Sequence, residues 1–261
     1  MIMGASHVTL ACTDIDSAVG SLRRLGYQPD FLDHDVVNHP SKRSIIQGWS
    51  DQHSISLLRA MGGFPIELVS YPVEQSPYCG RYIGVFNAAE IEVAPYHGLE
   101  AVCASISAHG LPCKAGQFQD LSLPVLISSG GDGSAGLEGL VLLVSDIGCA
   151  RTFWCDGLGF RCEHETSDAV YLKLASPVAA WRIVLILVRS AMSVAKPPLN
   201  ARGMSCLSFL SSNVDDDVSR LTSIGAEDGA PAFEITVNRK RMSVAIVAFD
   251  GAYIELLRIL P

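Results

Sequence analysis

The stretch "SHVTLACTDIDSAVGSLRRLGY", residues 6–27, contains the unit from which this chain is built. It consists of an apolar strand, an Asp-Ile pair, a helix of about ten residues and a glycine at which a new strand begins. The stretch "EGLVLLVSDIGCARTFWCDGLGF", residues 138–160, has the same order. Asp14 and Asp146 occupy equivalent places and are 132 positions apart, about half of the chain. The sequence therefore predicts a duplicated architecture.

Each of these two helices has start and stop signals. Asp14 and Asp146 are suited to be N-caps, because a short carboxylate accepts hydrogen bonds from the free backbone N–H groups of the first turn. Gly26 and Gly159 are suited to end the helices. In the first helix the apolar positions recur with helical spacing, which predicts one face packed on a sheet; these positions are Ile15, Ala18, Val19, Leu22 and Leu25.

Two further strand–helix–glycine units follow the same pattern, "AEIEVAPYHGLEAVCASISAHGLP" at 89–112 and "SCLSFLSSNVDDDVSRLTSIGAE" at 205–227. Strand-like segments follow each helix, although in the second unit only "LPVLISS" is clear. The predicted strands are 28–37, 53–60, 65–71, 161–165, 168–175, 181–188, 232–237, 242–249 and 252–259. We therefore predict four βαβββ modules in two halves. The modules span about 1–75, 85–130, 135–192 and 200–261, and the halves span 1–132 and 133–261.

Composition narrows the class of protein. Hydrophobic residues make up 49% and charged residues 18% of 261, typical of a compact globular chain. A net charge of −8 argues against nucleic acid or an anionic membrane as a partner. The N-terminus lacks the pattern of a signal peptide, and the eight cysteines show neither C-x-x-C nor zinc-finger spacing. We expect a cytoplasmic monomer or homodimer that binds a small molecule.

Two strand-like segments contain an acidic residue where an apolar one is expected. Glu67 lies in "FPIELVSYP" (64–72) and Glu255 in "AYIELLRIL" (252–260). A buried carboxylate is costly unless it is protonated, paired or bound to a metal ion. The alternative is that each glutamate lies on an edge strand with one face in water.

Strand alternation predicts which neighbours share a face with these acids. His7 shares its face with Thr9 and Ala11, while the bulky Val8 and Leu10 face the helix. By the same reasoning, the face that looks into a cavity contains Val69 and Tyr71 beside Glu67, Leu257 beside Glu255, and Cys206 with Ser208. Three histidines between the first helix and the third strand, His34, His39 and His53, are expected on a surface loop at the rim. "NRKRM" (238–242) is expected to be a solvated hairpin turn.

This organisation resembles the vicinal oxygen chelate superfamily, which includes glyoxalase I, extradiol dioxygenases and bleomycin-binding proteins. The resemblance rests on "SHVTLACTDIDSAV", "SDIGCARTFWCDGLGF" and "DGAYIELLRI" and covers nearly the whole chain. It implies an α+β fold in which paired modules form two open, curled mixed β-sheet barrels with helices outside. It also implies that metal ligands come from the first and last strands of each module.

The resemblance assigns those ligand positions residue by residue. In the first and fourth modules they are His7, Glu67, Cys206 and Glu255. In the second and third modules they are apolar or glycine and cannot bind a metal; these positions are Ile91, a residue near Leu126, Gly139 and Val184. If the first module pairs with the fourth, all the ligands converge in one cavity. If neighbouring modules pair, each cavity holds only two of them. The first arrangement explains two buried acids better.

One imidazole and two carboxylates suit one divalent ion of Mn, Fe, Co, Ni or Zn, with positions left for substrate oxygens. The resemblance then implies a lyase or isomerase acting on a small oxygen-rich metabolite, with Glu67 or Glu255 as general base. Cys206 departs from the histidine or glutamate usual in the family; it is either a ligand or a thiol that narrows the cavity. The alternative function is a metal-free binding protein of the bleomycin-resistance type. A dioxygenase is a minor alternative, because two histidines and one glutamate do not occur together.

Overall fold

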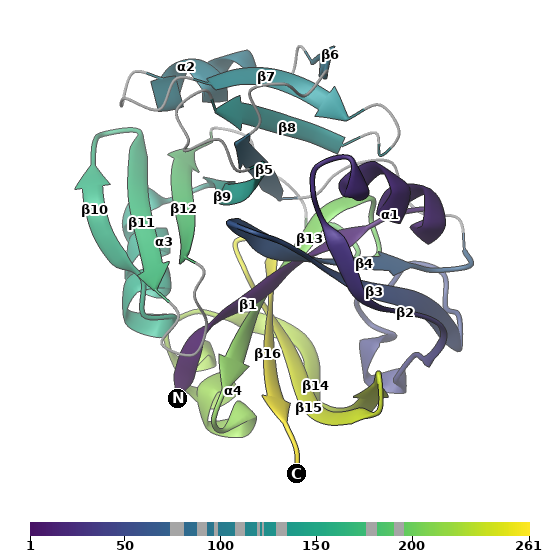
Figure 1. Ribbon diagram of the computed structural model, residues 1–261. Helices are drawn as coiled ribbons and strands as arrows, with labels where there is room; N and C mark the ends of the chain where they lie inside the picture. Colours follow the sequence, from purple (N-terminus) through teal and green to yellow (C-terminus); the bar gives the residue numbers. More distant parts are fainter. Residues whose placement is uncertain are drawn as a thin grey trace.

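The computed structural model describes residues 1–73, 81–87, 93–96, 99–107, 113–118, 121, 123–128, 135–175, 182–190 and 196–261. It shows a sheet-rich α+β fold with curled, unclosed sheets, as the sequence predicts (Figure 1). No helix in the described residues is long and apolar enough to cross a membrane.

Four consecutive modules make up the chain. The first contains β1 (Ile2–Ala11), α1 (Ile15–Arg23), β2 (Gln28–Val37), the 3-10 turn η1 (Pro40–Lys42), β3 (Gln52–Ala60) and β4 (Gly63–Ser70). The second contains β5 (Tyr82–Asn87), β6 (Ala94–Pro95), α2 (Glu100–Ser107), β7 (Cys113–Phe118) and β8 (Leu123–Ser128). The third contains β9 (Gly136–Val144), α3 (Ile147–Thr152), the π-helical turn η3 (Phe153–Gly157), β10 (Arg161–Glu165), β11 (Ala169–Ala175) and β12 (Arg182–Arg189). The fourth contains β13 (Gly203–Ser211), α4 (Val214–Ser223), β14 (Glu227–Val237), β15 (Lys240–Phe249) and β16 (Ala252–Ile259).

The predicted helix signals are confirmed. The Asp14 carboxylate accepts a hydrogen bond from the Ser17 backbone N–H at 3.0 Å, and Asp146 accepts one from Cys149 at 2.9 Å. Gly26 follows α1 with φ +82°, a left-handed conformation that costs a residue with a Cβ more than it costs glycine. The repeated Asp-Ile and Gly positions therefore fix the length of the helix between two strands.

The start of the second module differs from the prediction. Its first strand is β5, at Tyr82–Asn87, and not the segment at 89–95. All six residues of β5 are buried, so the strand has no alternation by which it could be recognised. Ile91, the predicted ligand position of this module, lies outside the described residues, and β6 pairs with β7 at the edge.

The first strands of the modules determine how the modules pair. Within each module the first strand is parallel to the last: β1 to β4, β5 to β8, β9 to β12 and β13 to β16. Between modules β1 pairs antiparallel with β13, and β5 pairs antiparallel with β9. The first module thus shares a sheet with the fourth, and the second with the third. The two sheets join where Met204 of β13 pairs with Tyr82 of β5.

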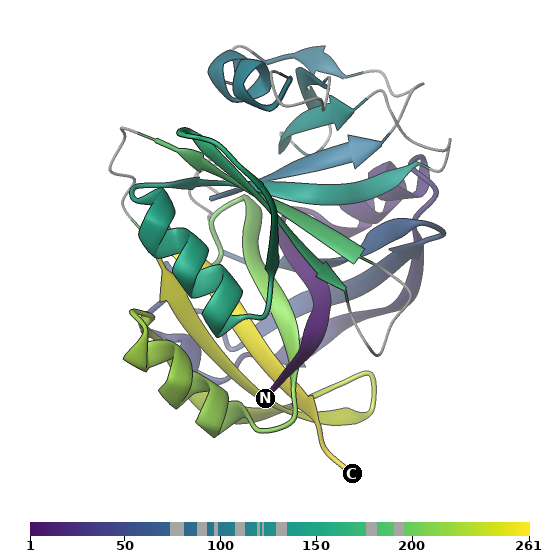
Figure 2. The ribbon, with the colours of Figure 1, turned by 90° about the vertical axis from the view of Figure 1, so that its left-hand side faces the viewer.

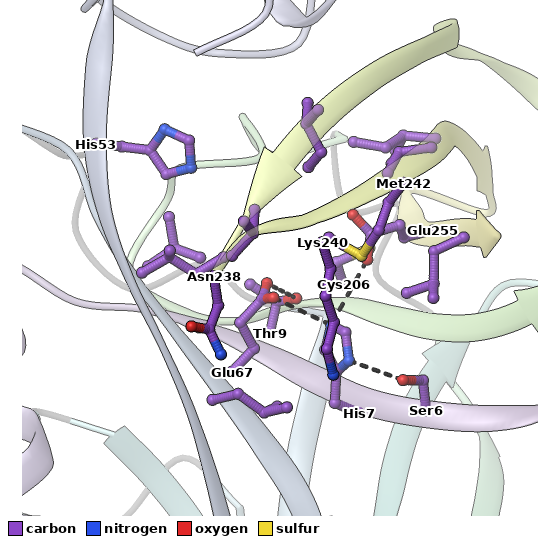
Figure 3. Close-up of a pocket in the computed structure, with 18 of the residues that line it drawn as sticks. Ser6, His7, Thr9, His53, Glu67, Cys206, Asn238, Lys240, Met242 and Glu255 are labelled. Carbon is purple, nitrogen blue, oxygen red and sulfur yellow. Dashed lines mark hydrogen bonds and ion pairs between the residues drawn. The ribbon is translucent and has the colours of Figure 1, made fainter. Parts of the chain in front are cut away.

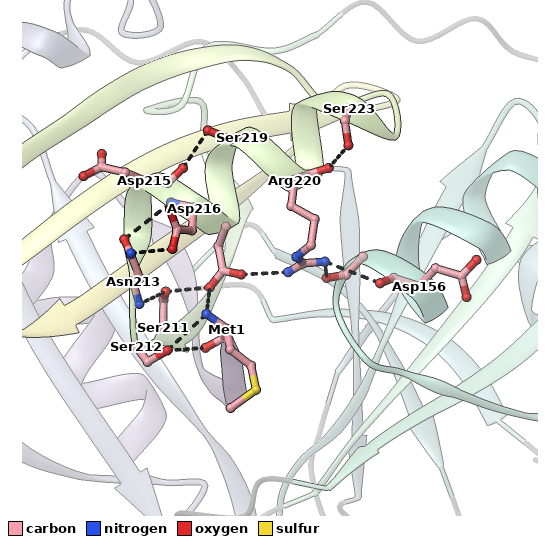
Figure 4. A network of polar contacts seen from close by, with 12 residues as sticks. Met1, Asp156, Ser211, Ser212, Asn213, Asp215, Asp216, Ser219, Arg220 and Ser223 are labelled. Carbon is pink, nitrogen blue, oxygen red and sulfur yellow. Dashed lines mark hydrogen bonds and ion pairs between the residues drawn. The ribbon is translucent and has the colours of Figure 1, made fainter.

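Helices α3 and α4 lie next to each other on an outer face of the sheets (Figure 2). The buried Asp217 of α4 accepts hydrogen bonds from Ser211 Oγ at 2.7 Å and from Arg220 at 2.9 Å. Arg220 also donates to the Gly157 carbonyl of η3 at 2.5 Å (Figure 4). This polar network joins the third module to the fourth on the side away from the concave faces.

The two concave faces differ in what fills them. On the sheet of the second and third modules, apolar side chains of β5, β8, β9 and β12 form one cluster with Leu99, Val102 and Ile106 from α2 and the residue before it. Gly139 and Val184 pair across this sheet and Leu126 is fully buried. On the sheet of the first and fourth modules, a cavity remains open. The functional site is built there.

Candidate functional site

Two equivalent pairs of residues lie at the centre of the β1–β13 seam. In the antiparallel register His7 lies opposite Ser208, and Thr9 lies opposite Cys206. The register therefore makes His7 in β1 equivalent to Cys206 in β13, and Thr9 equivalent to Ser208. The parallel partner of Thr9 is Glu67, and the parallel partner of Ser208 is Glu255. The two acids thus occupy the same position in two modules.

Glu67 and Glu255 both reach the same imidazole. The His7 Nε2 atom is 3.4 Å from Glu67 Oε2 and 3.5 Å from Glu255 Oε2 (Figure 3). The side chains of His7, Glu67 and Glu255 are only 7%, 15% and 18% exposed. We call these three residues the His-Glu-Glu triad. Neither acid lies on a solvated edge strand, since β4 and β16 each have a neighbour on both sides.

Each carboxylate also has a hydroxyl donor from the adjacent first strand. Thr9 Oγ1 donates to Glu67 Oε1 at 3.2 Å, and Ser208 Oγ donates to Glu255 Oε2 at 2.7 Å. The other ring nitrogen of the imidazole, Nδ1, lies 3.0 Å from Ser6 Oγ. These contacts fix the orientation of all three triad side chains.

The electrostatics of the triad follow from burial and proximity. Burial by itself lowers the pKa of His7, but the charges and hydrogen bonds of Glu67 and Glu255 outweigh it and raise this pKa to about 10. Burial also acts to raise the pKa of Glu255, yet the contact with His7 lowers it below its usual value. Without a metal ion the triad therefore holds a protonated imidazole between two carboxylates.

The donor types of the triad fit a divalent metal ion. A first-row ion bound at about 2.1 Å keeps two neighbouring donors about 3.0–3.5 Å apart, and the observed separations are 3.4 and 3.5 Å. The buried His7 Nε2 has no hydrogen-bond partner of good geometry in the described part of the chain. Across the same residues, no three His, Cys, Asp or Glu side chains are already arranged around one metal position. A metal ion bound by all three would therefore require the triad side chains to rearrange.

Cys206 is 3% exposed and faces the same cavity. Burial, followed by the charges of Glu255 and Glu67, raises the pKa of this thiol well above its usual value. Without a metal ion Cys206 is thus a neutral thiol at neutral pH. It narrows the cavity at the position equivalent to His7.

The triad opens into a cavity of about 370 Å³ between the first and fourth modules. Five of the residues predicted to face a cavity line it: Thr9, Ala11, Val69, Tyr71 and Leu257. The sixth, Ser208, is fully buried and supports Glu255 from behind. Ile55, Val244 and Ile246 add apolar surface. Most of the exposed surface of the cavity is thus apolar, although polar side chains besides the triad also line it.

Some of those polar side chains were not expected in the cavity. Lys42, from η1, is 8% exposed and lines it. His53 was expected on the surface, but it lies on β3, is 5% exposed, and stacks on Tyr71 with ring centroids 5.2 Å apart. Asn238 and Lys240, expected in a solvated turn, lie at the mouth (Figure 3). Of these residues, only His53 could have been predicted to face the cavity from the sequence. It lies two positions before Ile55 in β3, so both side chains are on the same face of the strand.

No protein-family model and no curated protein sequence matches the chain. Solved structures do match it. A point mutant of glyoxalase I from Zea mays gives a TM-score of 0.63 at 12% identity, over 97% of this chain and 93% of that one. Another glyoxalase I structure from Zea mays gives 0.58 at 13% identity, over 98% and 91%. A candidate dioxygenase from Bacillus subtilis subsp. subtilis strain 168 gives 0.58 at 14% identity, over 100% and 86%.

The chain has a glyoxalase-like fold, shared with glyoxalase I and with the candidate dioxygenase. The resemblance seen in the sequence is confirmed at this level. At such low identities the likeness establishes the fold alone, and a fold of this kind hosts several reactions. The reaction of this glyoxalase-like chain therefore has to be argued from the triad and the cavity.

Proposed function

We propose that the chain is a metal-dependent enzyme, a lyase or isomerase of the glyoxalase type, which binds a small oxygen-rich metabolite in the cavity of the first and fourth modules. The observation that supports this proposal most directly is the convergence of His7, Glu67 and Glu255 from three strands of two modules. A one-imidazole, two-carboxylate set suits Mn, Fe, Co, Ni or Zn in the divalent state. We infer one ion per chain.

In this proposal His7 Nε2 and the carboxylates of Glu67 and Glu255 hold the ion. When bound, the ion would act as a Lewis acid toward substrate oxygens. His7 ligates only after it loses its Nε2 proton, and the remaining Nδ1 proton is then donated to Ser6 Oγ, 3.0 Å away. The apolar walls of the cavity exclude water from the carboxylates, which strengthens their action as bases.

Glu67 is the better candidate for the general base. Its Oε1 atom accepts from Thr9 at 3.2 Å, whereas Glu255 Oε2 accepts from Ser208 at 2.7 Å. A longer hydrogen bond restrains its carboxylate less, so Glu67 has more freedom to take a proton from a bound substrate. Glu255 then stays in place as the firmly held carboxylate.

The experiment is a metal analysis of untagged protein followed by Co²⁺ titration. We expect about one equivalent of a divalent ion per chain and a visible Co²⁺ spectrum that His7→Gln and Glu255→Gln abolish. Proton exchange into 2-hydroxy and 2-oxo compounds in D₂O, followed by NMR, should then require the ion and Glu67. Metal-free protein that retains full exchange activity would overturn the proposal.

A metal-free binding protein of the bleomycin-resistance type is the second candidate. The observation in its favour is that a protonated His7 already neutralises part of the charge of both glutamates, beside largely apolar walls. This function predicts that ligand affinity survives treatment with a chelator and the Glu67→Gln substitution. A dioxygenase is the weaker alternative, because the triad has one histidine and two glutamates; oxygen consumption with catechols would test it.

A further inference from the structure

Lys42 is a buried cation that the proposed chemistry does not use. It lies in η1 and lines the cavity with 8% exposure. Within the described residues its ammonium group has no hydrogen-bond or ion-pair partner, although the charges of Glu67 and Glu255 act on it through space. Buried lysines are rare and are normally paired. An unpaired lysine in a cavity therefore points to an anionic ligand.

The segment that carries Lys42 is held in place by the fourth module and the residues before it. The Asn200 side chain makes two hydrogen bonds to the backbone of Gln47, at 3.0 and 2.8 Å. The Leu199 backbone N–H donates to the Ile45 carbonyl at 2.7 Å. His39, the N-cap of η1, stacks on Phe233 of β14, with ring centroids 4.7 Å apart. The segment that carries Lys42 is thus held by contacts to residues 199–200 and to β14.

The charge balance of the loaded site identifies the class of anion. With a divalent ion bound, the two charges of the ion offset those of Glu67 and Glu255, and His7 is neutral. Lys42 then leaves one uncompensated positive charge in a buried site, which is unfavourable. One negative charge on the ligand cancels it, whereas a dianion such as a phosphate monoester leaves a negative excess.

The other charged groups of the cavity do not change this count. Arg59 and Asp30 pair with each other at 2.5 Å. Lys240 is exposed at the mouth, where water solvates it. Burial and the charge of Lys42 lower the pKa of His53 to about 3, so this imidazole is neutral. Burial raises the pKa values of Tyr71 and Cys206, so both are neutral as long as they do not bind the ion.

We propose that Lys42 binds the carboxylate of a monoanionic substrate, such as a 2-hydroxy or 2-oxo acid with an apolar body, whose neighbouring oxygen faces the triad. The proposal rests on the metal-dependent function above, since the count of one positive charge requires the ion. The apolar walls formed by Ile55, Val244 and Leu257 suit the body of such an acid. Lys42 is then a substrate-binding residue.

Isothermal titration calorimetry of the Co²⁺-loaded protein tests this proposal with three probes. They are mandelate, its uncharged amide, and phenyl phosphate. We expect the parent to bind mandelate at least tenfold more tightly than the amide or the phosphate. Lys42→Met should abolish the preference for mandelate over the amide, Lys42→Arg should retain part of it, and Lys240→Met, the matched control at the mouth, should change it less than twofold.

Equal affinity for mandelate and the amide in the parent, no mandelate binding at millimolar concentration, or a preference that survives Lys42→Met would overturn the proposal. The parent comparison needs no variant, so it stands even if a variant fails to fold; thermal melts check the variants. Metal content is measured in each sample. A parent protein that binds no metal would contradict the proposed function itself. A metal-loaded parent that does not prefer mandelate over its amide would contradict only the role of Lys42.

Discussion

Thr9 and Ser208 occupy equivalent positions in the first and fourth modules, and each donates a hydrogen bond to the glutamate on the strand parallel to its own. The first and fourth modules therefore share a hydroxyl–carboxylate pair on each side of the β1–β13 seam. They differ in the residue two positions earlier, which is His7 in one module and Cys206 in the other. The single imidazole of His7 therefore contacts both carboxylates.

The hydroxyls of Ser208 and Thr9 should contribute different amounts to the free energy of unfolding. Ser208→Ala removes a 2.7 Å hydrogen bond to a buried carboxylate, so we expect a loss of about 2 kcal/mol in the free energy of unfolding. Thr9→Val removes a 3.2 Å bond and keeps the side-chain shape, so we expect about 1 kcal/mol. Urea unfolding in the presence of a chelator measures both. Equal losses would contradict the assignment of Glu67 as the more mobile acid.

The metal-free protein should lose stability as the pH rises above neutrality. The pKa of His7 is about 10 in the folded state and 6.5 in the unfolded state. A raised pKa contributes stability that is complete below pH 6.5 and is lost as the pH rises toward 10. Lys42, whose pKa burial lowers to about 8, acts in the opposite direction only above that pH. The window for His7 is therefore pH 6.5 to 8.

Across this window we expect the free energy of unfolding to fall by roughly 1 kcal/mol per pH unit, up to about 2 kcal/mol in all. Urea unfolding at both ends of the window, with a chelator present, measures the fall. His7→Gln is the control and should make the stability nearly independent of pH there. A parent protein that is equally stable at both ends would show that the imidazole is neutral between the glutamates.

Much of the fold could be predicted because its local signals are repeated. The Asp N-caps and closing glycines recur, and the predicted strands of the first, third and fourth modules lie within a few residues of the observed ones. The first strand of the second module was missed because "YIGVFN" is buried on both faces, while the more strand-like 89–95 lies nearby. Periodicity cannot identify a strand that does not alternate.

The convergence of His7, Glu67 and Glu255 was the expectation if the first module pairs with the fourth, because the resemblance puts ligand positions on first and last strands. The residues alone left the edge-strand alternative open. Lys42 could not be predicted in the same way. Its position depends on hydrogen bonds between Asn200 and Gln47, which are 153 residues apart. No local pattern in "NHPSKRS" indicates that this turn folds over the cavity. Residues carried by irregular segments are placed by tertiary contacts alone.

Cys206 should be dispensable for metal binding. It is 3% exposed, and the triad already supplies three donors. Cys206→Ser should therefore leave the Co²⁺ affinity within about threefold of the parent, a change of less than 1 kcal/mol. The Co²⁺ spectrum gives a second readout, because a thiolate ligand would add a charge-transfer band near the ultraviolet. Such a band in the parent, lost in Cys206→Ser, would show that Cys206 is a fourth ligand.

Asn200 should control how firmly the segment that carries Lys42 is held. Asn200 is 1% exposed, and its amide satisfies both the N–H and the carbonyl of Gln47. Asn200→Ala removes both hydrogen bonds and leaves the two backbone groups without these partners, so we expect a loss of about 2–3 kcal/mol in the free energy of unfolding. Asn200→Asp retains an acceptor for the Gln47 N–H but places a carboxylate oxygen against the Gln47 carbonyl oxygen, so we expect a loss at least as large as in Asn200→Ala.

Hydrogen exchange measured by mass spectrometry separates this local effect from general destabilisation. In Asn200→Ala the peptides that cover residues 38–50 should exchange faster than in the parent, because two of the hydrogen bonds that hold this segment are lost. The peptides of β1 and β13 serve as the internal control and should keep their protection, since their ladder does not involve Asn200. Unchanged exchange at 38–50 would mean that the Leu199–Ile45 hydrogen bond and the stacking of His39 on Phe233 hold the segment without Asn200.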